Sequence, residues 1–291
     1  MKLAANQPVA VVTGASSGIG QSAAGKLAAR GWQVIGVGRD PRRCAAAEAE
    51  IAAAARDGGG FTMVRGDFTL MAEVSRVAGE VAGRAPRLDV LINNAGGVRD
   101  RQVITAEGTE ATFAANHLAP FLLTRELLPL LRVSAASRPR GTARVIAVSS
   151  SAHRVVDGLP WDDLQSFRET PPTLAYCRAK LATILFTREL ARRLAPDGIA
   201  AQAMHPGVVA SNFAAHGDAA MQAHMAAADT VAPDEPAETL AWLATEPEGG
   251  RDSGRYFYRK AEETPAEAAQ DRTAAARLWE ESAALLARLG F

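Results

Sequence analysis

Two residues capable of proton transfer stand four positions apart in the second half of the chain, Tyr176 and Lys180. The segment around them has the apolar periodicity of a helix, so their side chains are predicted to lie on one face, one turn apart. On that face the lysine ammonium would favour the phenolate and lower the pKa of the tyrosine. Tyr176 could then exchange a proton with a substrate oxygen near neutral pH.

Three consecutive serines at positions 149–151 precede this pair and follow a predicted strand. A hydroxyl at that place could hydrogen-bond a carbonyl oxygen while negative charge develops on it, as an oxyanion donor does. The serines could equally be hydrogen-bonding residues at the end of a strand. Residue types alone leave both interpretations open and do not distinguish Ser150 from its neighbours.

A glycine-rich turn near the N-terminus predicts a nucleotide site. Residues 13–20 read TGASSGIG, directly after an apolar run and at the start of a helical pattern. Glycines without Cβ atoms would let a pyrophosphate approach the backbone and the N-terminus of the helix. The turn could also be an ordinary tight connection, and its glycine spacing departs from the usual Gly-x-Gly-x-x-Gly pattern.

Arg39 follows the second predicted strand, where the adenosine ribose of a dinucleotide would lie. A guanidinium pairs well with a 2′-phosphate, whereas an acidic residue would bind the 2′-hydroxyl. The sequence therefore favours NADP(H) over NAD(H) as cofactor. Arg42 or Arg43 could add charge, although Asp40 lies among them, and these arginines could instead form a solvated loop.

Polar residues also follow the third and fourth predicted strands. Asp67 is placed to accept a hydrogen bond from the adenine amino group, but aspartates in loops are common caps. Residues 93–96, which read NNAG, offer side-chain amides and a glycine that permits close approach to the cofactor. For Asn93 alone, an ordinary Asn/Gly turn is an equal alternative.

The elements that position these residues alternate short β-branched runs with longer Ala-rich helical stretches. The predicted strands are 9–13, 33–37, 61–64, 88–92, 143–148 and 199–204, with 256–258 as a seventh candidate. The predicted helices are about 18–30, 42–56, 70–84, 105–132, 174–194 and 236–245. Right-handed crossovers then give an α/β fold, a Rossmann-type doubly wound parallel sheet of about seven strands with helices on both faces.

Composition narrows the class of protein. The chain has 291 residues, 48% of them hydrophobic, with 32 basic and 32 acidic residues. That balance argues against nucleic acid or an anionic membrane as partner, and the size fits a single domain over residues 1–291. Two distant cysteines and a short polar N-terminus favour a cytoplasmic protein without a membrane span. We expect no metal site, because no carboxylate pairs with His205, His216 and His224 at ligand spacing.

The chain resembles the short-chain dehydrogenase/reductase (SDR) family nearly end to end. The resemblance is carried by segments 13–20 and 93–96 and by Asn116, Ser150, Tyr176, Lys180, Pro206 and Gly207. It implies a catalytic set made of Asn116, Ser150, Tyr176 and Lys180. Asn116 would kink its helix and hold a water that passes protons to Lys180, and Lys180 would hydrogen-bond the nicotinamide ribose.

The same resemblance, with the residues discussed above, gives the expected cofactor site. Ser211 stands where threonine is usual in the segment that contacts the nicotinamide carboxamide, and it keeps the hydroxyl. The expected cofactor-binding residues are Gly14, Ser16, Ser17, Gly18, Ile19, Gly20, Arg39, Asp67, Phe68, Asn94, Ala95, Gly96, Tyr176, Lys180, Pro206, Gly207, Val209 and Ser211.

Segments 116–124, 148–154 and 185–190 are similar to the retinol dehydrogenase-like branch. Members of that branch prefer NADP(H) and act on apolar aldehydes, ketones or alcohols. We do not expect retinoid substrates, because the N-terminus does not read as the membrane anchor of the microsomal retinoid enzymes. The family also implies a homodimer, paired through the helices that begin near Thr105 and Leu174.

Two segments interrupt the regular alternation. The insertion 151–173 contains Trp161 and Phe167, which could wall a substrate pocket or pin the loop to the core. The region 208–233, with Met221 and Met225, could form a mobile lid over the substrate or a small packed helix.

The sequence therefore predicts an NADP(H)-dependent oxidoreductase that interconverts a small apolar aldehyde or ketone and the corresponding alcohol. Hydride would move to or from the nicotinamide, and Tyr176 would give or take the proton. One alternative is a non-catalytic NADP(H)-sensing protein, which would not need the Ser/Tyr/Lys/Asn set. Another is epimerisation or dehydration of a nucleotide sugar, which the glycine spacing and the lack of a long C-terminal substrate domain disfavour.

Overall fold

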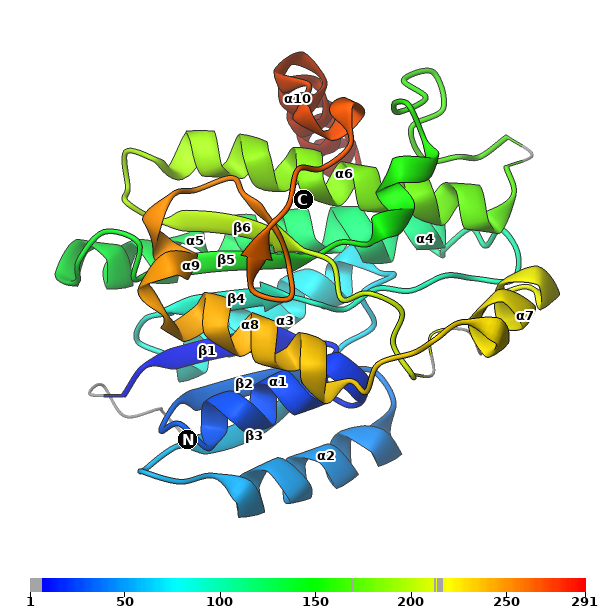
Figure 1. The fold of residues 1–291 in the computed structure, drawn as a ribbon. Coiled ribbons are helices and arrows are strands. Elements are labelled where there is room, and N and C mark those ends of the chain that lie inside the picture. The colour runs from blue at the N-terminus through cyan, green and yellow to red at the C-terminus, as the bar shows by residue number, and fades with distance from the viewer. Residues whose placement is uncertain (1–6, 169, 212, 214–216) are drawn as a thin grey trace.

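The computed structural model describes residues 7–168, 170–211, 213 and 217–291. Within them, eight strands form one sheet in the order β3-β2-β1-β4-β5-β6-β7-β8 (Figure 1). All neighbouring strands are parallel except β7 and β8. The strands are β1 (Val9–Thr13), β2 (Gln33–Gly38), β3 (Gly60–Arg65), β4 (Val90–Asn93), β5 (Arg144–Val148), β6 (Ala200–Met204), β7 (Tyr256–Tyr258) and β8 (Ala261–Glu262). The predicted doubly wound parallel sheet is confirmed, with one strand more than expected.

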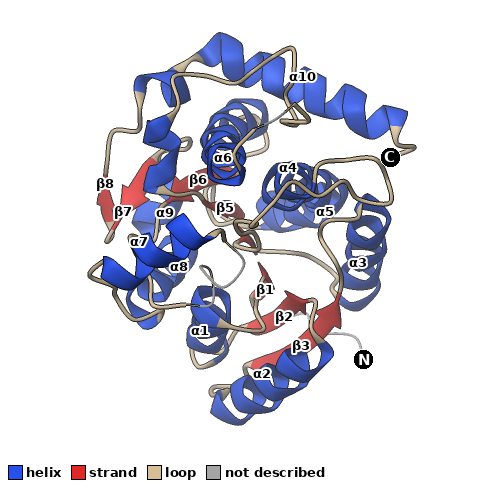
Figure 2. Ribbon diagram, turned by 90° about the vertical axis from the view of Figure 1, so that its right-hand side faces the viewer, coloured by secondary structure: helices blue, strands red, loops and turns tan. Residues whose placement is uncertain are grey.

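Helices follow nearly every strand and cover both faces of the sheet (Figure 2). They are α1 (Gly18–Ala28), α2 (Pro41–Ala54), α3 (Met71–Arg84), α4 (Ala111–Phe113), α5 (Ala119–Ser137), α6 (Pro172–Leu194), α7 (Ala219–Ala227), α8 (Asp234–Thr245), α9 (Pro247–Arg251) and α10 (Arg272–Arg288). A π-helical turn, η1 (Ala114–Leu118), joins α4 to α5, and short 3-10 helices form η2 (Ser151–Val155) and η4 (Glu267–Gln270).

Burial of both faces explains why the strands are continuous apolar runs. All five residues of β1 are buried. Val9 and Val11 join an apolar cluster with α3, α5 and α6, whereas Ala10 and Val12 join a second cluster with α1, α2 and α8. Successive side chains of a strand point to opposite faces, so a strand covered on both sides has no polar alternation.

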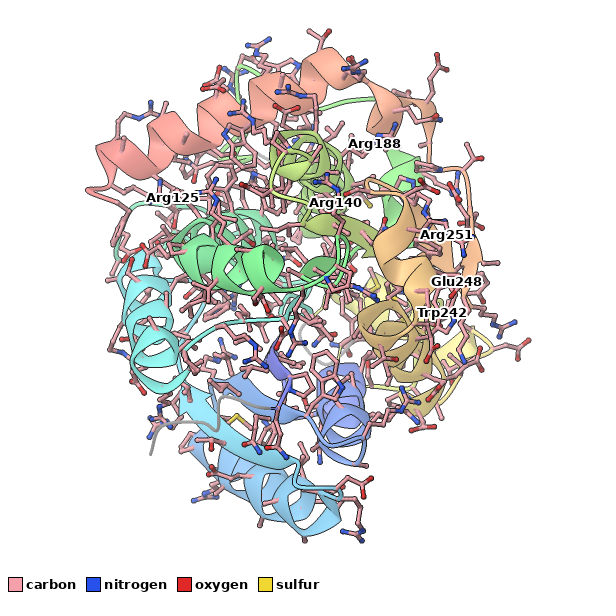
Figure 3. The ribbon with its side chains drawn as sticks, turned by 90° about the vertical axis from the view of Figure 1, so that its left-hand side faces the viewer. Arg125, Arg140, Arg188, Trp242, Glu248 and Arg251 are labelled. Carbon is pink, nitrogen blue, oxygen red and sulfur yellow. The ribbon has the colours of Figure 1, made fainter. Side chains whose placement is uncertain are left out.

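The C-terminal part of the sheet is held by aromatic contacts. Trp242, labelled on α8 in Figure 3, packs edge-on against Phe257 of β7, with ring centroids 5.8 Å apart.

Within the described residues, no helix combines the length and apolar character needed to cross a membrane.

The eighth strand was not predicted. It pairs antiparallel with β7 through a turn whose residues Arg259 and Lys260 both have positive φ, 47° and 63°. Glycine or asparagine usually marks such a turn, because other residues enter the left-handed region at a cost. Arg-Lys carries no such signal, so the hairpin could not be predicted from these residues.

The helix predicted from residue 105 begins instead at Ala111, and the prediction of its start was wrong. The hydroxyls of Thr105 and Thr109 form a hydrogen bond of 2.7 Å across a turn. Gly108 in this turn has a φ of 76°. The Glu110 carboxylate then caps α4 by accepting from Phe113 N at 2.8 Å. Thr and Gly favour a turn over the interior of a helix, and the capping acid fixes the start.

Helix α10 lies across α6 and beside α5, outside the layer that covers the sheet (Figure 2). Its Asp271 cap accepts from the backbone N–H groups of Thr273 and Ala274. Trp279 of α10 packs on Phe121 of α5, with centroids 4.7 Å apart, and on Phe186 of α6 at 5.9 Å. The helix thereby covers an apolar surface made by α5 and α6.

Candidate active site

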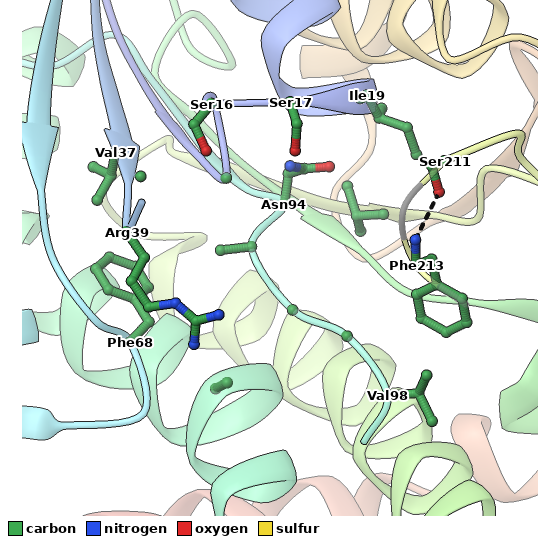
Figure 4. Close-up of a pocket in the computed structure, with 18 of the residues that line it drawn as sticks. Ser16, Ser17, Ile19, Val37, Arg39, Phe68, Asn94, Val98, Ser211 and Phe213 are labelled. Carbon is green, nitrogen blue, oxygen red and sulfur yellow. Dashed lines mark hydrogen bonds between the residues drawn. The ribbon is translucent and has the colours of Figure 1, made fainter. Parts of the chain in front are cut away.

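A cavity of about 530 Å³ opens at the carboxyl ends of strands β1 to β6. The chain reverses its direction of winding between β1 and β4, and this crevice is where open α/β sheets bind ligands. Arg39 and Phe68 lie on one side of the pocket, and Val98 and Phe213 lie on the other (Figure 4). The expected cofactor residues that line it are Gly14, Ser16, Ser17, Gly18, Ile19, Arg39, Asp67, Phe68, Asn94, Ala95, Gly96, Tyr176, Lys180, Pro206 and Ser211.

The glycine turn joins β1 to α1 in a backbone conformation that favours glycine. Gly14 and Gly18 have φ angles of 72° and 57°. A Cβ atom on Gly14 would lie 2.8 Å from the Asn94 amide nitrogen. Ser17, the N-cap of α1, makes no side-chain capping bond. The first N–H groups of a helix have no partners inside it, so this end of the cavity can accept an anion.

Three expected cofactor residues, Gly20, Gly207 and Val209, do not line the cavity. A Cβ atom on Gly20 would lie 2.3 Å from the Gly14 oxygen, so this glycine allows α1 to pack against the turn. Gly207 has a φ of 76° and shapes the chain after β6. Val209 is buried and pairs with Val231.

Arg39 and Asp67 face each other at the β2 and β3 end of the cavity. An Arg39 guanidinium nitrogen lies 3.8 Å from Oδ2 of Asp67, and about half of the arginine side chain is exposed. Oδ1 of Asp67 accepts from the backbone N–H and hydroxyl of Thr69, at 3.0 and 2.9 Å. The aspartate thus caps its own turn with one oxygen and leaves the other toward the cavity. Arg43 also lines this end, whereas Arg42 does not.

The two asparagines after β4 have different surroundings. Asn94 lines the cavity and donates through Nδ2 to the Thr13 carbonyl oxygen at 2.9 Å. The Thr13 hydroxyl accepts from the N–H groups of Asn94 and Ala95, at 3.0 and 2.9 Å. Asn93 is buried and donates to the Thr124 hydroxyl at 3.0 Å. Asn94 therefore shapes the cavity, and Asn93 ties β4 to α5.

Tyr176 and Lys180 lie together on α6 and line the cavity. The lysine nitrogen is 5.5 Å from the centre of the tyrosine ring, and it donates to the Val148 carbonyl oxygen at 3.0 Å. The tyrosine ring also packs on Phe213, with centroids 5.2 Å apart. The predicted one-face arrangement of the pair is present in the structure.

Burial governs the protonation of both groups. It lowers the pKa of Lys180 from 10.5 to about 8. It also raises the pKa of Tyr176 well above its usual range, against the lowering effect of a hydrogen bond with the Ser150 side chain. The expected lowering of the tyrosine pKa is therefore absent, because removal from water outweighs the polar contact. At neutral pH the phenol is protonated and can act as a proton donor.

Ser149 and Ser150, which follow β5, make different contacts. The Ser149 hydroxyl donates to the Lys180 carbonyl oxygen at 2.8 Å and so ties β5 to α6. Ser150 contacts Tyr176, and its hydroxyl accepts from Ala152 N at 3.2 Å as the cap of η2. The interpretation as a hydrogen-bonding residue at the end of a strand holds for Ser149, and the oxyanion role of Ser150 stays a prediction.

Asn116 does not line the cavity but fixes the loop that does. It lies in the π-helical turn η1, so the helix departs from α geometry at this residue, as the expected kink would require. Its side chain accepts from Gly97 N at 3.1 Å and donates to Gly97 O at 2.9 Å. It also donates to Thr112 O at 2.8 Å. These bonds clamp the loop beside Lys180, because a Cβ atom on Gly96 would lie 3.3 Å from the lysine nitrogen.

The region 208–233 contributes Ala210, Ser211, Phe213 and Pro233 to the cavity lining. Its helix α7 lies between Phe213 and Pro233 in the chain, and positions 212 and 214–216 lie outside the described residues. In the insertion, Trp161 packs on the core below Arg277 of α10, and Phe167 is exposed. Neither lines the cavity. For Trp161, the interpretation as a pin to the core is confirmed.

The histidines considered for a metal site have other contacts. His205 lies 3.1 Å from Glu263 through Nε2 and stacks on Tyr258, with centroids 4.3 Å apart. His216 and the side chain of His224 lie outside the described residues. In the part of the chain that the structure describes, no group of three ligating side chains comes together.

Sequence reasoning missed several residues that line the cavity. Some flank expected ones and could have been found from them, such as Gly38 before Arg39 and Gly97 after Gly96. Ala111 and Ala115 stand four apart in the helical region and carry no polar signal. The remaining lining residues that were not expected are Val37, Gly66, Thr69, Val98, Arg99, Val148, Ser149, Ala210, Phe213 and Pro233.

Comparison with known proteins places this site in a family. A family model described as short chain dehydrogenase matches residues 8–222. Retinol dehydrogenase 13 of Homo sapiens is 36% identical over 292 residues, covering 95% of this chain and 83% of the relative. Retinol dehydrogenase 14 of Homo sapiens is 36% identical over 296 residues, covering 96% and 86%.

A solved structure, the Pseudomonas aeruginosa RhlG/NADP active-site complex, superposes with a TM-score of 0.68 at 29% identity. It covers 88% of this chain and 95% of that chain. The family match spans the glycine turn, the serine segment and the Tyr176/Lys180 pair. The chain belongs to the short-chain dehydrogenase family of oxidoreductases, in its retinol dehydrogenase-like branch.

Proposed function

We propose that this protein is an NADP(H)-dependent oxidoreductase that interconverts an apolar aldehyde or ketone and the corresponding alcohol. The observation that carries the proposal is the meeting, in one cavity, of the glycine turn with Tyr176 and Lys180. A site that only sensed the nucleotide would not need a buried proton donor at the far end from Arg39. The names of the human relatives, retinol dehydrogenases, support alcohol or carbonyl chemistry.

The charges of the cavity fit a phosphorylated dinucleotide. Among its described lining residues, Arg39, Arg43, Arg99 and Lys180 are cationic and Asp67 is acidic. The bare N-terminus of α1 adds a partial positive charge near the glycine turn. Arg39 and Arg43 would hold a 2′-phosphate, since guanidinium groups bind phosphate oxygens in pairs. NADP(H) is therefore the proposed cofactor, and the bound NADP of the Pseudomonas aeruginosa complex agrees with it.

The cofactor would supply one part of the chemistry and the side chains of this protein the other. When bound, the nicotinamide ring would supply or accept the hydride. The protonated Tyr176 phenol would donate its proton to the substrate oxygen as the carbonyl is reduced, and it would take the proton back in the reverse direction. Ser150, which contacts the phenol, would hold the same oxygen while negative charge develops.

Lys180 and Asn116 would support this pair. A lysine with a pKa of about 8 can give up or take a proton near neutral pH, so it can return a proton to the tyrosine. Its ammonium would also hydrogen-bond the ribose of the nicotinamide half. Asn116 would act by holding Gly97 and the loop beside Lys180, because its side chain is already bonded to that loop.

The substrate end of the cavity favours an apolar carbonyl compound. Val98, Ala111, Ala115 and Phe213 line the cavity, and Phe213 packs on the ring of Tyr176. Small alanines leave room, and the two larger apolar side chains can cover a carbon chain or ring. The region 208–233 would then act as the segment that closes over the substrate.

The test is consumption of NADPH and NADH by purified protein with a panel of apolar aldehydes and ketones. We expect turnover with NADPH that is lost in Tyr176→Phe, while NADPH binding, followed by its fluorescence, is unchanged. Tyr258→Phe, which changes a tyrosine that does not line this cavity, is the matched control. Wild-type turnover by Tyr176→Phe would refute the mechanism. Tight NADPH binding without turnover of any compound would favour the sensing alternative.

A further inference from the structure

Arg99 differs from the other arginines of the active-site cavity. It is half-buried and lines the cavity, yet among the described residues it has no hydrogen bond or ion pair. Arg39 has Asp67 at 3.8 Å, and Arg43 has Asp40 at 3.9 Å. A partly buried guanidinium that pairs with no acidic side chain loses hydration and gains no compensating contact. Such a group is suited to an anion that comes from outside the chain.

The position of Arg99 places it at the proton-transfer end of the cavity. The preceding loop is clamped at Gly97 by Asn116, and a Cβ atom on Gly96 would lie 3.3 Å from the Lys180 nitrogen. Three residues of chain span at most about 11 Å, so Arg99 cannot be far from Lys180. Val98 lies on the same side of the pocket as Phe213 and on the opposite side from Arg39 (Figure 4). The expected 2′-phosphate site is therefore not the partner of Arg99.

The apolar part of the cavity wall brings no charge that would oppose an anion at Arg99. Val98, which precedes Arg99 in the chain, lines the cavity together with Ala111, Ala115 and Phe213. Asp67, the acidic residue among the described lining residues, is engaged with Thr69 and Arg39 at the far end. An oxyanion at Arg99 would meet the paired N–H donors of a partly buried guanidinium, where charge-assisted bonds are stronger than in water.

We propose that the substrate is an apolar carbonyl compound that carries a carboxylate, and that Arg99 binds this carboxylate while Tyr176 protonates the carbonyl oxygen. The inference rests on the proposed oxidoreductase function and adds the substrate class to it. The carbonyl and the carboxylate would stand at opposite ends of an apolar body. Arg99 would then determine specificity by its charge and by its position on the clamped loop.

The test compares straight-chain aldehydes with aldehydes of the same length that end in a carboxylate. With NADPH saturating, we expect wild type to prefer the carboxylated member in kcat/KM by roughly tenfold. Arg99→Gln should abolish that preference by lowering kcat/KM for the carboxylated aldehyde alone. Arg99→Lys should restore part of it, because the charge returns without the paired donors. Arg101→Gln, at an exposed arginine two residues away that pairs with Asp100, is the matched control and should change neither value.

Three results would overturn the proposal. Wild type could show no preference for the carboxylated aldehydes. Arg99→Gln could lower kcat/KM equally for both members of a pair, which would indicate a role in the fold. The same variant could weaken NADPH binding, measured by cofactor fluorescence, which would assign Arg99 to the cofactor.

Failure of the proposed function is a separate result. If wild type reduces no aldehyde, binding of ω-hydroxy carboxylates of the same lengths to the protein with NADP⁺ is measured by calorimetry instead. Binding that weakens about tenfold in Arg99→Gln but not in Arg101→Gln would uphold the carboxylate site without the reaction. Binding that is absent, or equal in both variants, would overturn it.

Discussion

Replacement of Lys180 by methionine should make the cofactor-free protein more stable at neutral pH. The lysine is 5% exposed, and burial lowers its pKa from 10.5 to about 8. This lowering of the pKa corresponds to about 3 kcal/mol of destabilisation at pH 7, at about 1.4 kcal/mol for each tenfold change in the acid constant. Methionine is of similar length and carries no charge, but it leaves the Val148 carbonyl oxygen without its donor, which costs about 1 kcal/mol. The net expectation is a gain of about 2 kcal/mol.

The pH dependence of the free energy of unfolding distinguishes the cost of burying the Lys180 charge from a general packing effect. Because the pKa of Lys180 is lower in the folded than in the unfolded chain, the unfolded chain binds more protons from about pH 8 to about pH 10.5. The wild-type free energy of unfolding should therefore rise with pH through that window, relative to Lys180→Met. The advantage of the variant should fall by about 2 kcal/mol between pH 7 and pH 9.5.

The assay is urea unfolding of the cofactor-free proteins, followed by tryptophan fluorescence at both pH values. Lys26→Met is the control, since Lys26 pairs with Asp234 at 2.9 Å and has a raised pKa. That change should lower stability slightly. A Lys180→Met protein that is less stable than wild type at pH 7, by an amount independent of pH, would show that Lys180 bears no cost of burial.

Two further predictions concern the ends of the site. Arg39→Ala should lower the ratio of kcat/KM with NADPH to that with NADH by about tenfold, measured with one aldehyde, and leave the NADH value unchanged; an unchanged ratio would exclude Arg39 from the 2′-phosphate site. His153→Phe should lower kcat about tenfold without changing the NADPH dissociation constant. Nδ1 of His153 lies 2.7 Å from the Ser150 carbonyl oxygen, and its Nε2 accepts from the N–H of Ala266 at 3.0 Å. These two contacts position the serine. Partial recovery in His153→Gln would support this role, and a matching loss of cofactor binding would contradict it.

The parts of the fold that could be predicted are those whose signals are local. Strands buried on both faces are continuous apolar runs, and helices between them have their own periodicity, so the order of elements followed from the chain. The hairpin β7–β8 was missed because Arg259 and Lys260 adopt positive φ without glycine or asparagine. Its geometry is imposed by the packing around it, which no short segment reveals.

In the active site, too, features with a local sequence signal could be predicted and features set by tertiary packing could not. Tyr176 and Lys180 could be placed together because four positions on a helix fix their spacing. Their protonation could not be predicted, because it depends on burial by residues distant in the sequence, such as Phe213. Arg99 was missed for a related reason. An arginine in a loop has no local pattern, and only the cavity shows that it lacks a partner.

The position of α10 bears on how two copies of this chain could associate. In relatives of this fold, the helices corresponding to α5 and α6 were expected to join subunits, but here α10 buries Leu278 and Leu286 on that side. A second copy approaching this face would meet the polar outer surface of α10 rather than the apolar stripes below. The chain therefore covers part of the apolar surface of α5 and α6 with its own C-terminal helix.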